Sequence, residues 1–286
     1  MGGKKSIKTV GNSQDRYLLY IDMLGFSELV RKKGQVEKLY RIIDSLNVHQ
    51  HHDFRTIVFS DTVLVYNRTD ATTPYDRHYL IMYLCEFAQD LFFRILPLDL
   101  HFRAYLRYGQ FVHNEMTNVE AFFGSALVDS YEAEKDLQCC GLFIDNKLLP
   151  DCDIFKTTPY DLKCHFVHLM QRLDDISGEH FTYPVDPIFI EPSGTEWDLA
   201  ECFLYLQNIH KHMNNMSMSP RIRAKYAATW QMIRARHQRL LDCLEAHNFD
   251  ANAVSKMDWK KAVKRARQVY LGPKPTSARP TQSDKP

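Results

Sequence analysis

The segment at residues 17–26 reads Tyr17-Leu18-Leu19-Tyr20-Ile21-Asp22-Met23-Leu24-Gly25-Phe26 and sets one aspartate among apolar, strand-forming side chains. A second segment further along the chain, Thr56-Ile57-Val58-Phe59-Ser60-Asp61-Thr62-Val63-Leu64-Val65-Tyr66, does the same. A carboxylate costs several kcal/mol to remove from water unless it is paired or binds a metal. The two aspartates therefore suggest a shared divalent cation and phosphate chemistry. The alternative is that each aspartate lies at a strand end and faces solvent.

The composition is that of a folded globular chain. Its 286 residues are 45% hydrophobic and 12% aromatic, enough for one large domain or two small ones. The 36 basic and 35 acidic residues leave a net charge of +1, which gives no global electrostatic case for binding nucleic acid or a membrane. No apolar run reaches the roughly 18 residues of a membrane span, and the start lacks a signal peptide. The first six residues match the short myristoylation pattern, but a flexible N-terminal segment is the simpler interpretation of them.

The seven cysteines are odd in number and show no Cys-x-x-Cys spacing. This pattern argues against a disulfide framework and a zinc site, and for the reducing cytoplasm. A cluster of three histidines at 49, 51 and 52 beside Asp53 is typical of a solvated loop. His101, His165 and His168 have no partners at catalytic spacing in the sequence.

Hydrophobic periodicity predicts a regular alternation of elements in the first half of the chain. The predicted strands are 17–23, 54–60, 62–67, 101–112 and 141–145, and the predicted helices are 26–33, 36–48, 75–96 and 124–138. Ser60-Asp61 is expected at or near the tip of a hairpin, and 113–121 is expected to be a polar loop. Thr73-Pro74 opens the long helix and Pro97 ends it. The order β-α-α-β-β-α-β-α-β predicts an α+β fold, in which helices cover an antiparallel or mixed sheet.

The remaining residues divide the chain into further parts. We expect a flexible start at 1–15, a core at 16–150, a mixed and then helical extension packed on the core at 151–271, and a disordered tail at 272–286 that is rich in Pro, Ser, Thr and Lys. Short strands are predicted at 165–169 and 187–191. Helix is predicted over most of 196–246, with a break at Ser219-Pro220.

Four motifs, in order over residues 17–145, resemble the class III nucleotide cyclases. Tyr20-Ile21-Asp22-Met23-Leu24-Gly25-Phe26 is similar to their opening F-x-D-x-x-G-F signature, and Phe59-Ser60-Asp61 stands at the place of their second metal-binding aspartate. Arg107-Tyr108-Gly109 and Phe123-Gly124-Ser125-Ala126-Leu127-Val128-Asp129-Ser130-Tyr131-Glu132-Ala133-Glu134 resemble one branch, the pyrimidine nucleotide cyclases of bacterial antiphage (Pycsar) systems.

The resemblance implies a ferredoxin-like βααββαβ core that cyclises a nucleoside triphosphate. The 3′-hydroxyl attacks the α-phosphorus and pyrophosphate leaves. Two Mn²⁺ or Mg²⁺ ions, held by Asp22, Asp61 and the backbone carbonyl of Met23, would assist this step. The turn Leu24-Gly25-Phe26, which opens a helix, would offer backbone N–H groups to the triphosphate. An ordinary strand-to-helix turn explains Gly25 equally well.

This sequence departs from the purine cyclases at several positions. Ile57 stands where they carry a lysine that reads the base, which argues against adenine or guanine recognition; Arg55, on the same strand face, is a candidate substitute. Val128 and Glu132 stand where they carry asparagine and arginine. Arg107 is therefore our candidate for stabilising charge in the transition state. For Arg55 and Arg107 the alternative is a solvated or paired surface arginine. Packing and helix-face solvation explain Tyr131 and Glu134 as well as the resemblance does.

The leading hypothesis is a uridylate cyclase that makes 3′,5′-cyclic UMP from UTP as a second messenger in antiphage defence, sensed by a separate effector. A cytidylate cyclase acting on CTP is the close alternative. The resemblance implies a head-to-tail homodimer with composite sites, in the cytoplasm and without a membrane partner. Two further hypotheses are a catalytically degenerate module that binds a nucleotide and a nucleic-acid-binding protein. The latter would use basic stretches at 221–239 and 260–267, which solvated helix faces explain more simply, so we expect no nucleic acid.

Overall fold

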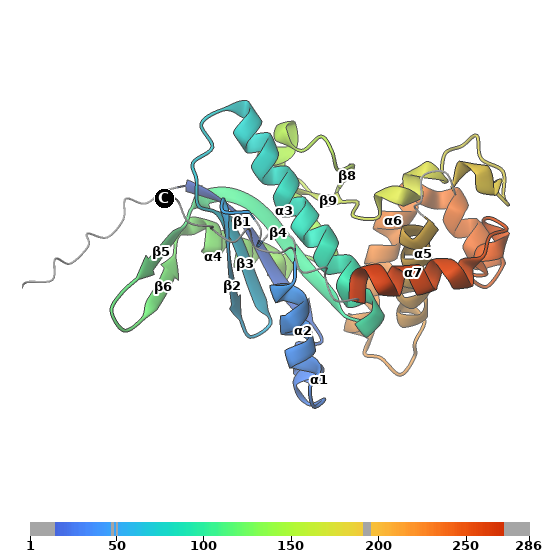
Figure 1. Cartoon of the computed structure of the whole chain (residues 1–286), viewed down its shortest axis with the longest axis horizontal. Coiled ribbons are helices and arrows are strands. Elements are labelled where there is room, and N and C mark those ends of the chain that lie inside the picture. The colour runs from blue at the N-terminus through green and yellow to red at the C-terminus, as the bar shows by residue number, and fades with distance from the viewer. Residues whose placement is uncertain (1–14, 47–48, 50, 191–195, 272–286) are drawn as a thin grey trace, which may run out of the picture.

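The computed structural model describes residues 15–46, 49, 51–190 and 196–271. A seven-stranded sheet in the order β2-β3-β1-β4-β7-β9-β8 lies at its centre, beside a separate hairpin β5-β6. The strands are β1 (Asp15–Leu24), β2 (Phe54–Phe59), β3 (Thr62–Asn67), β4 (His101–Gln110), β5 (Val112–Glu115), β6 (Glu120–Phe123), β7 (Gly141–Asp145), β8 (Thr157–Pro159) and β9 (Cys164–Val167). The helices are α1 (Phe26–Val30), α2 (Gln35–Asp44), α3 (Pro74–Ile95), α4 (Ser125–Asp136), α5 (Glu196–Met213), α6 (Pro220–Ala246) and α7 (Trp259–Leu271). The predicted α+β fold is confirmed, with helices covering an antiparallel-rich sheet (Figure 1).

β1 lies between β3 and β4 and pairs antiparallel with both. Alternate residues from Tyr17 to Met23 enter the main hydrophobic core, which α3 covers. Leu18 and Tyr20 enter a second cluster on the opposite face, which α4 covers in part. Because side chains alternate along a strand, Asp22 lies on this second face.

The hairpin β2–β3 turns where the sequence predicts. Phe59 pairs with Thr62, so Ser60 and Asp61 form a two-residue turn. Ser60 adopts a left-handed φ of 55°. Positive φ at the first turn position matches the twist of the strands that it joins. The turn places Asp61 at the tip of the hairpin.

α3 begins and ends close to the predicted positions. The hydroxyl of Thr73 accepts a hydrogen bond from the backbone N–H of Asp76 at 3.1 Å, and the Asp76 carboxylate accepts one from the N–H of Thr73 at 2.8 Å. This capping box satisfies two backbone donors at the start of the helix. Pro97 follows the last turn, in the short 3₁₀ helix Leu96–Leu98. Local sequence signals are therefore sufficient to predict where α3 begins and ends.

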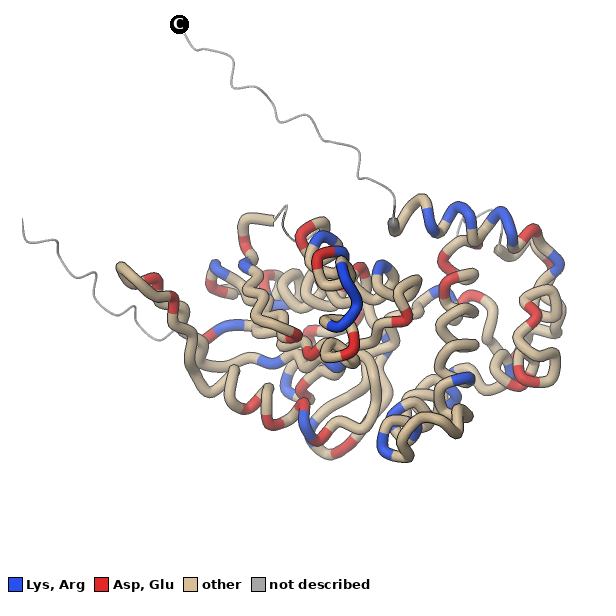
Figure 2. The backbone as a smooth tube through the Cα atoms, turned by 90° about the horizontal axis from the view of Figure 1, so that it is seen from below, with Lys and Arg blue, Asp and Glu red and all other residues tan. Residues whose placement is uncertain are grey.

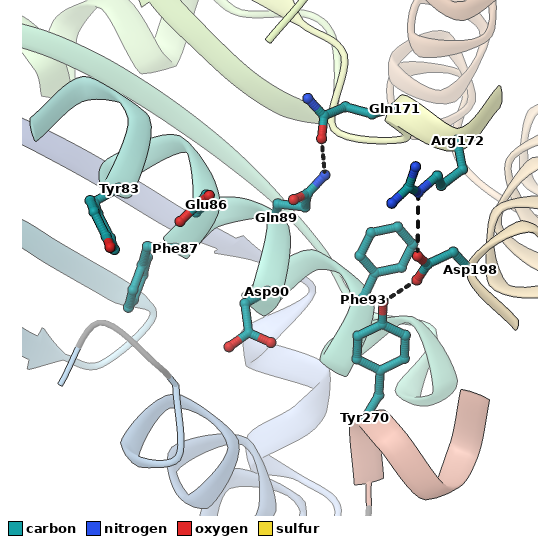
Figure 3. A pocket seen from close by; sticks show the side chains of 10 residues that line it. All are labelled: Tyr83, Glu86, Phe87, Gln89, Asp90, Phe93, Gln171, Arg172, Asp198 and Tyr270. Atoms are coloured by element: carbon teal, nitrogen blue, oxygen red, sulfur yellow. Dashed lines mark hydrogen bonds and ion pairs between the residues drawn. The ribbon is translucent and has the colours of Figure 1, made fainter. Parts of the chain in front are cut away.

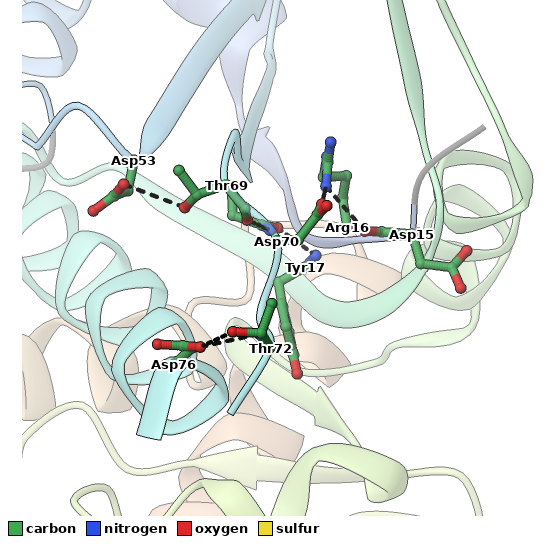
Figure 4. A network of polar contacts seen from close by, with 9 residues as sticks. Asp15, Arg16, Tyr17, Asp53, Thr69, Asp70, Thr72 and Asp76 are labelled. Carbon is green, nitrogen blue, oxygen red and sulfur yellow. Dashed lines mark hydrogen bonds and ion pairs between the residues drawn. The ribbon is translucent and has the colours of Figure 1, made fainter. Parts of the chain in front are cut away.

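The first residues of β1 are fastened by polar contacts (Figure 4). Asn67 accepts a hydrogen bond from the backbone N–H of Tyr17 at 2.6 Å, and Arg16 contacts Asp70. These contacts hold β1 against the segment that leads from β3 into α3. Because β1 is held in place at its first residues, these contacts also help to position Asp22 near its other end.

Two sequence predictions are wrong. The polar loop expected at 113–121 forms the β5–β6 hairpin, in which Val112 pairs with Phe123. Polar side chains hid it, because a two-stranded arm exposed to solvent needs no apolar alternation. The strand expected at 187–191 is the 3₁₀ helix Pro187–Phe189, whose preceding Asp186 accepts a hydrogen bond from the backbone N–H of Ile188. Proline is favoured at the first position of a helical turn, where its missing N–H is not needed.

Residues after 150 continue both the sheet and the core. β9 pairs with β7 and β8 with β9. The main core joins Leu91 of α3 to Leu206 of α5 and Trp230 of α6. Helix is confirmed at both sides of the predicted break at Ser219-Pro220, and β9 confirms a strand near 165–169. Among the described residues, no helix combines the length and apolar character needed to cross a membrane.

Figure 2 colours the positions of lysine and arginine along the backbone, and several of them lie along the C-terminal helix α7. Several are engaged in ion pairs, such as Arg236 with Asp174 at 2.7 Å and Arg265 with Glu196 at 3.1 Å. These ion pairs agree with the interpretation that the basic residues lie on solvent-exposed faces of the C-terminal helices. Three predicted segments lie wholly or partly outside the described residues: residues 1–14 of the flexible start, residues 47–48 of the second predicted helix, and the tail at 272–286.

Candidate active site

Asp22 and Asp61 lie at the same edge of the sheet. Asp22 is paired with Thr62 across the β1–β3 ladder. The backbone N–H of Met23 donates a hydrogen bond to the carbonyl oxygen of Asp61 at 2.9 Å. Neighbouring strands run about 4.8 Å apart, so the register brings the two aspartates close together in space. Both side chains are partly exposed, and both are accessible to a ligand from solvent.

Arg103 of β4 is the immediate partner of Asp22 on the sheet face. The register places the two residues opposite each other, and the Nη2 atom of Arg103 lies 3.3 Å from Oδ2 of Asp22. The same guanidinium contacts Glu134 of α4. Sequence reasoning did not select Arg103. Its signal was present, because Arg103 shares the parity of Arg107 along the strand.

Glu134 is a buried residue of α4, for which the sequence left packing, helix-face solvation and the family resemblance as equal explanations. The residue is 4% exposed. Burial is the largest cause that raises the pKa of Glu134, to about 7, and the nearby Asp22 carboxylate adds to it, while Arg103 and Lys225 oppose it. Solvation is thus the wrong explanation for this side chain. The Asp22 end of the sheet therefore contains a second carboxylate that takes up a proton easily.

Arg107 lies on the same face as Asp22 but at the far end of it. Its guanidinium is 3.2 Å from Asp129 of α4 and 3.7 Å from Asp145 of β7. Arg107 lies four positions beyond Arg103 along β4, a span of about 13 Å. Arg107 therefore does not meet the two aspartates within one chain. It borders a cavity of about 530 Å³ that Asp129, Asp145 and Lys147 also line.

Arg55 stands in the same row of the sheet as Arg107. Arg55 pairs with Tyr66 and Tyr66 with Leu18, which pairs with Arg107. The Arg55 side chain contacts Glu115 of β5, so it is a paired arginine. Ile57 lies one row closer to Asp22 and packs against the second hydrophobic cluster. The sheet face thus has an acidic end at Asp22 and a row with two arginines at the other end.

The turn Leu24-Gly25-Phe26 leads from Asp22 into α1. Gly25 adopts a left-handed φ of 79°, which favours glycine, and its carbonyl accepts the first bonds of α1. Phe26 stacks on Tyr40 of α2, with ring centroids 6.4 Å apart. The Tyr40 hydroxyl donates a hydrogen bond to the carbonyl of Ser60 at 3.1 Å. Tyr40 therefore holds the turn and the hairpin tip together.

A basic hollow adjoins this turn. It has a volume of about 450 Å³ and is lined by Phe26, Lys32, Lys33 and Ser60 among others. Sequence reasoning did not select the two lysines, although a basic pair just after the turn was the available signal. Ammonium groups in such a hollow suit an anionic ligand. Lys32 and Lys33 are therefore further candidate binding residues beside the turn.

The helix positions that depart from the purine cyclases are on the outside of α4. Val128 is 54% exposed and Glu132 is also exposed. Tyr131 is exposed and contacts Tyr20 edge to face. These side chains point outward, so they could meet only a ligand or partner that docks on α4.

A different cavity, of about 370 Å³, lies between α3, α5 and α7 (Figure 3). Asp198 accepts a hydrogen bond from the hydroxyl of Tyr270 at 2.5 Å, and Arg172 lies 3.9 Å from the same carboxylate. None of its lining residues is a candidate from the sequence. This cavity belongs to the junction with the C-terminal helices and not to the Asp22 edge.

Comparisons with known proteins give structural neighbours only. No description of a protein family matches the sequence, and no curated protein is similar to it. The adenylyl cyclase CyaB from P. aeruginosa superposes on 55% of this chain and 96% of its own, with 9% identity and a TM-score of 0.41. The guanylyl cyclase domain of the RhoGC fusion protein from the fungus Blastocladiella emersonii covers 54% and 95%, with 14% identity and a TM-score of 0.42. The guanylyl cyclase Cya2 covers 55% and 93%, with 12% identity and a TM-score of 0.38.

Proposed function

We propose that this chain is a nucleotide cyclase that converts a pyrimidine nucleoside triphosphate into its 3′,5′-cyclic monophosphate and diphosphate. UTP is the preferred substrate and CTP the alternative. The observation that carries the proposal is the hydrogen bond between Met23 and Asp61, which brings two carboxylates from distant segments to one sheet edge beside the Gly25 turn.

The donor set at this edge fits Mn²⁺ or Mg²⁺. Carboxylate and carbonyl oxygens, from Asp22, Asp61 and the Met23 backbone, are the ligands that these hard cations prefer. When bound, two such ions supply charge neutralisation at the phosphates and acidify the 3′-hydroxyl. Arg103 competes for Asp22, and Glu134 offers the guanidinium a second partner.

The chain's own residues would position the substrate around these ligands. Asp22 and Asp61 orient the reacting end, and the turn at Gly25 with Lys32 and Lys33 binds the triphosphate. Ile57 supports a pyrimidine over a purine, because it offers no hydrogen bond where the purine enzymes use lysine.

A head-to-tail homodimer would complete the site. Arg107 and Arg55 lie about 13 Å from the Asp22 row of the same chain, too far to act on the same phosphate. Two-fold pairing of this face places the arginine row of one chain against the acidic end of the other. Phe59, in the Asp22 row of the open strand β2, is 72% exposed and suits burial in such an interface. We further propose that the protein acts in the cytoplasm. Its cyclic nucleotide would serve as a messenger in antiphage defence, and a separate effector would sense it.

Incubation of the purified protein with Mn²⁺ and each of the four labelled triphosphates tests the activity. We expect a cyclic product from UTP and a smaller amount from CTP. Asp22→Asn and Asp61→Asn should each reduce the rate by at least about 100-fold, since each removes a cation ligand. Asp44→Asn, at an exposed helix end, is the matched control and should retain activity. No product from any triphosphate would refute the proposal, and activity in either aspartate variant would refute the metal assignment.

A degenerate nucleotide-binding module is the second candidate function. Existing ion pairs favour this second function, because the candidate catalytic groups already have partners. Arg107 is paired with Asp129 and Asp145, and Asp22 is paired with Arg103. Calorimetry separates the two functions. Binding of UTP without turnover, in protein loaded with Mn²⁺, supports the module.

A further inference from the structure

Asp99, His101 and His212 come together where the C-terminal helices meet the sheet. Asp99 follows the 3₁₀ helix Leu96–Leu98 with a left-handed φ of 54°, and His101 is the first residue of β4. His212 lies in the last turn of α5, 113 residues from Asp99. The sequence had shown no partner for His101 at catalytic spacing, because His212 comes from a distant segment of the chain. The cluster shares no residue with the Asp22 edge.

The three potential ligand atoms have the spacing of a metal site. Nε2 of His212 lies 2.9 and 3.0 Å from the two carboxylate oxygens of Asp99. Nε2 of His101 lies 3.5 Å from Oδ1 of Asp99, and one ligand atom from each residue falls within 4.8 Å of the others. Ligands about 2.0–2.2 Å from a tetrahedral ion are about 3.2–3.5 Å apart. The two histidine–aspartate separations lie close to this spacing, and the separation of the two histidine nitrogens is no more than 4.8 Å.

A buried imidazole nitrogen points into the cluster. His101 is 5% exposed, and within the described residues its Nε2 atom makes no hydrogen bond of normal geometry, only the 3.5 Å ion-pair contact with Asp99. A buried polar atom without a good hydrogen bond is costly, and a cation bound to its lone pair removes that cost. Tyr226 of α6 stacks on His212 at 4.8 Å and contacts the His101 ring at 5.3 Å, which closes one side of the cluster. The Asp99 side chain is half exposed, which leaves an opening to water on the other side.

We propose that Asp99, His101 and His212 bind one divalent transition-metal ion, with Zn²⁺ preferred. Two imidazoles and one carboxylate are borderline ligands that select zinc or a neighbouring transition metal over magnesium or manganese. Water completes the fourth position. The ion links the start of β4 to the end of α5, so its role is to fasten the helical extension to the sheet that carries the candidate active site. This proposal stands without the proposed function.

Metal binding by the full-length protein, stripped with a chelator, is the test. Titration with Zn²⁺ alone should show one tight equivalent and raise the unfolding temperature by about 5 °C at a hundredfold excess over the dissociation constant. His212→Ala and the shape-conserving variant Asp99→Asn should each weaken zinc binding at least tenfold. His180→Ala, an exposed histidine outside the cluster, is the matched control and should bind as wild type does.

Two further measurements keep the result unambiguous. Co²⁺ in place of Zn²⁺ should give the intense visible absorption of a four-coordinate nitrogen and oxygen site, and Asp99→Asn should remove it. Zinc bound instead at Asp22 and Asp61 would be lost in Asp61→Asn and kept in His212→Ala, and that pattern overturns the proposal. The absence of any tight equivalent in the wild type overturns it as well. Loss of cyclase activity leaves this titration unaffected, so the two proposals fail separately.

Discussion

Glu134 shows how far one residue's environment can differ from its sequence context. Its neighbours on α4 include the exposed Glu132, Lys135 and Asp136. Glu134 itself faces the sheet, and Arg103 reaches it from β4. The cluster of Asp22, Arg103 and Glu134 keeps two carboxylates on one guanidinium, so a proton on Glu134 relieves their repulsion.

We predict that Glu134→Gln changes the pH dependence of stability. The pKa of Glu134 in the folded chain is raised to about 7 by burial. A raised carboxyl pKa contributes stability that is complete below its unfolded value, about 4.3, and is lost as the pH rises through 7. The stability of the wild type relative to Glu134→Gln should therefore fall between pH 5.5 and pH 8, by on the order of 2 kcal/mol.

Thermal unfolding of both proteins followed by circular dichroism across this range provides the measurement. Titration of other groups is common to the two proteins and cancels in the difference. Parallel curves, with a constant gap at every pH, would contradict the raised pKa.

At the scale of elements, local signals account for most boundaries. The alternation of β1, the capping box of α3 and the Ser60-Asp61 turn each depend on residues a few positions apart. The β5–β6 hairpin escaped notice because its strands pack on little of the core. The folded chain shows why position 124 requires glycine. Its φ is 142°, and a Cβ there would lie 2.1 Å from the carbonyl oxygen of Gln110.

We predict that Gly124→Ala destabilises the protein by about 3 kcal/mol or prevents folding, because it combines a disfavoured φ with a backbone clash. Gly34→Ala is the matched control. Gly34 also has a positive φ, of 77°, but no atom lies within 4 Å of the added Cβ, so the cost should be about 1 kcal/mol. Urea unfolding measures both. Equal losses in the two variants would show that the close approach to Gln110 is unimportant.

At the scale of the whole molecule, one sheet face carries two chemical ends that cannot meet within a chain. The Asp22 row and the Arg107 row are about 13 Å apart. The main core runs from the sheet through α3 into α5 and α6. On the Asp22 face, α4 covers one part, and Ala228 and Met232 of α6 pack near Tyr105. The part around Phe59, which is 72% exposed, is available to a second copy.

We predict that inactive variants at opposite ends complement each other. Asp22→Asn and Arg107→Gln should each be inactive alone. Random exchange of subunits makes half the dimers mixed, each with one intact site, so the mixture should regain about one quarter of wild-type activity. Mixing Asp22→Asn with Asp61→Asn, which damage the same end, is the control and should regain none. A mixture of the first pair that stays inactive would rule out a composite site.

The sequence by itself determined β1 to β4, β7, the hairpin tip, the α3 caps and the order of the core elements, because periodicity and capping act over a few residues. It also indicated Asp22 and Asp61 as a pair. Only the tertiary structure brought Arg103 and Glu134 to Asp22, gave Arg107 and Arg55 acidic partners, and joined His101 to His212. These contacts link segments separated by tens of residues or more, and no local pattern encodes which buried charges will share a neighbour.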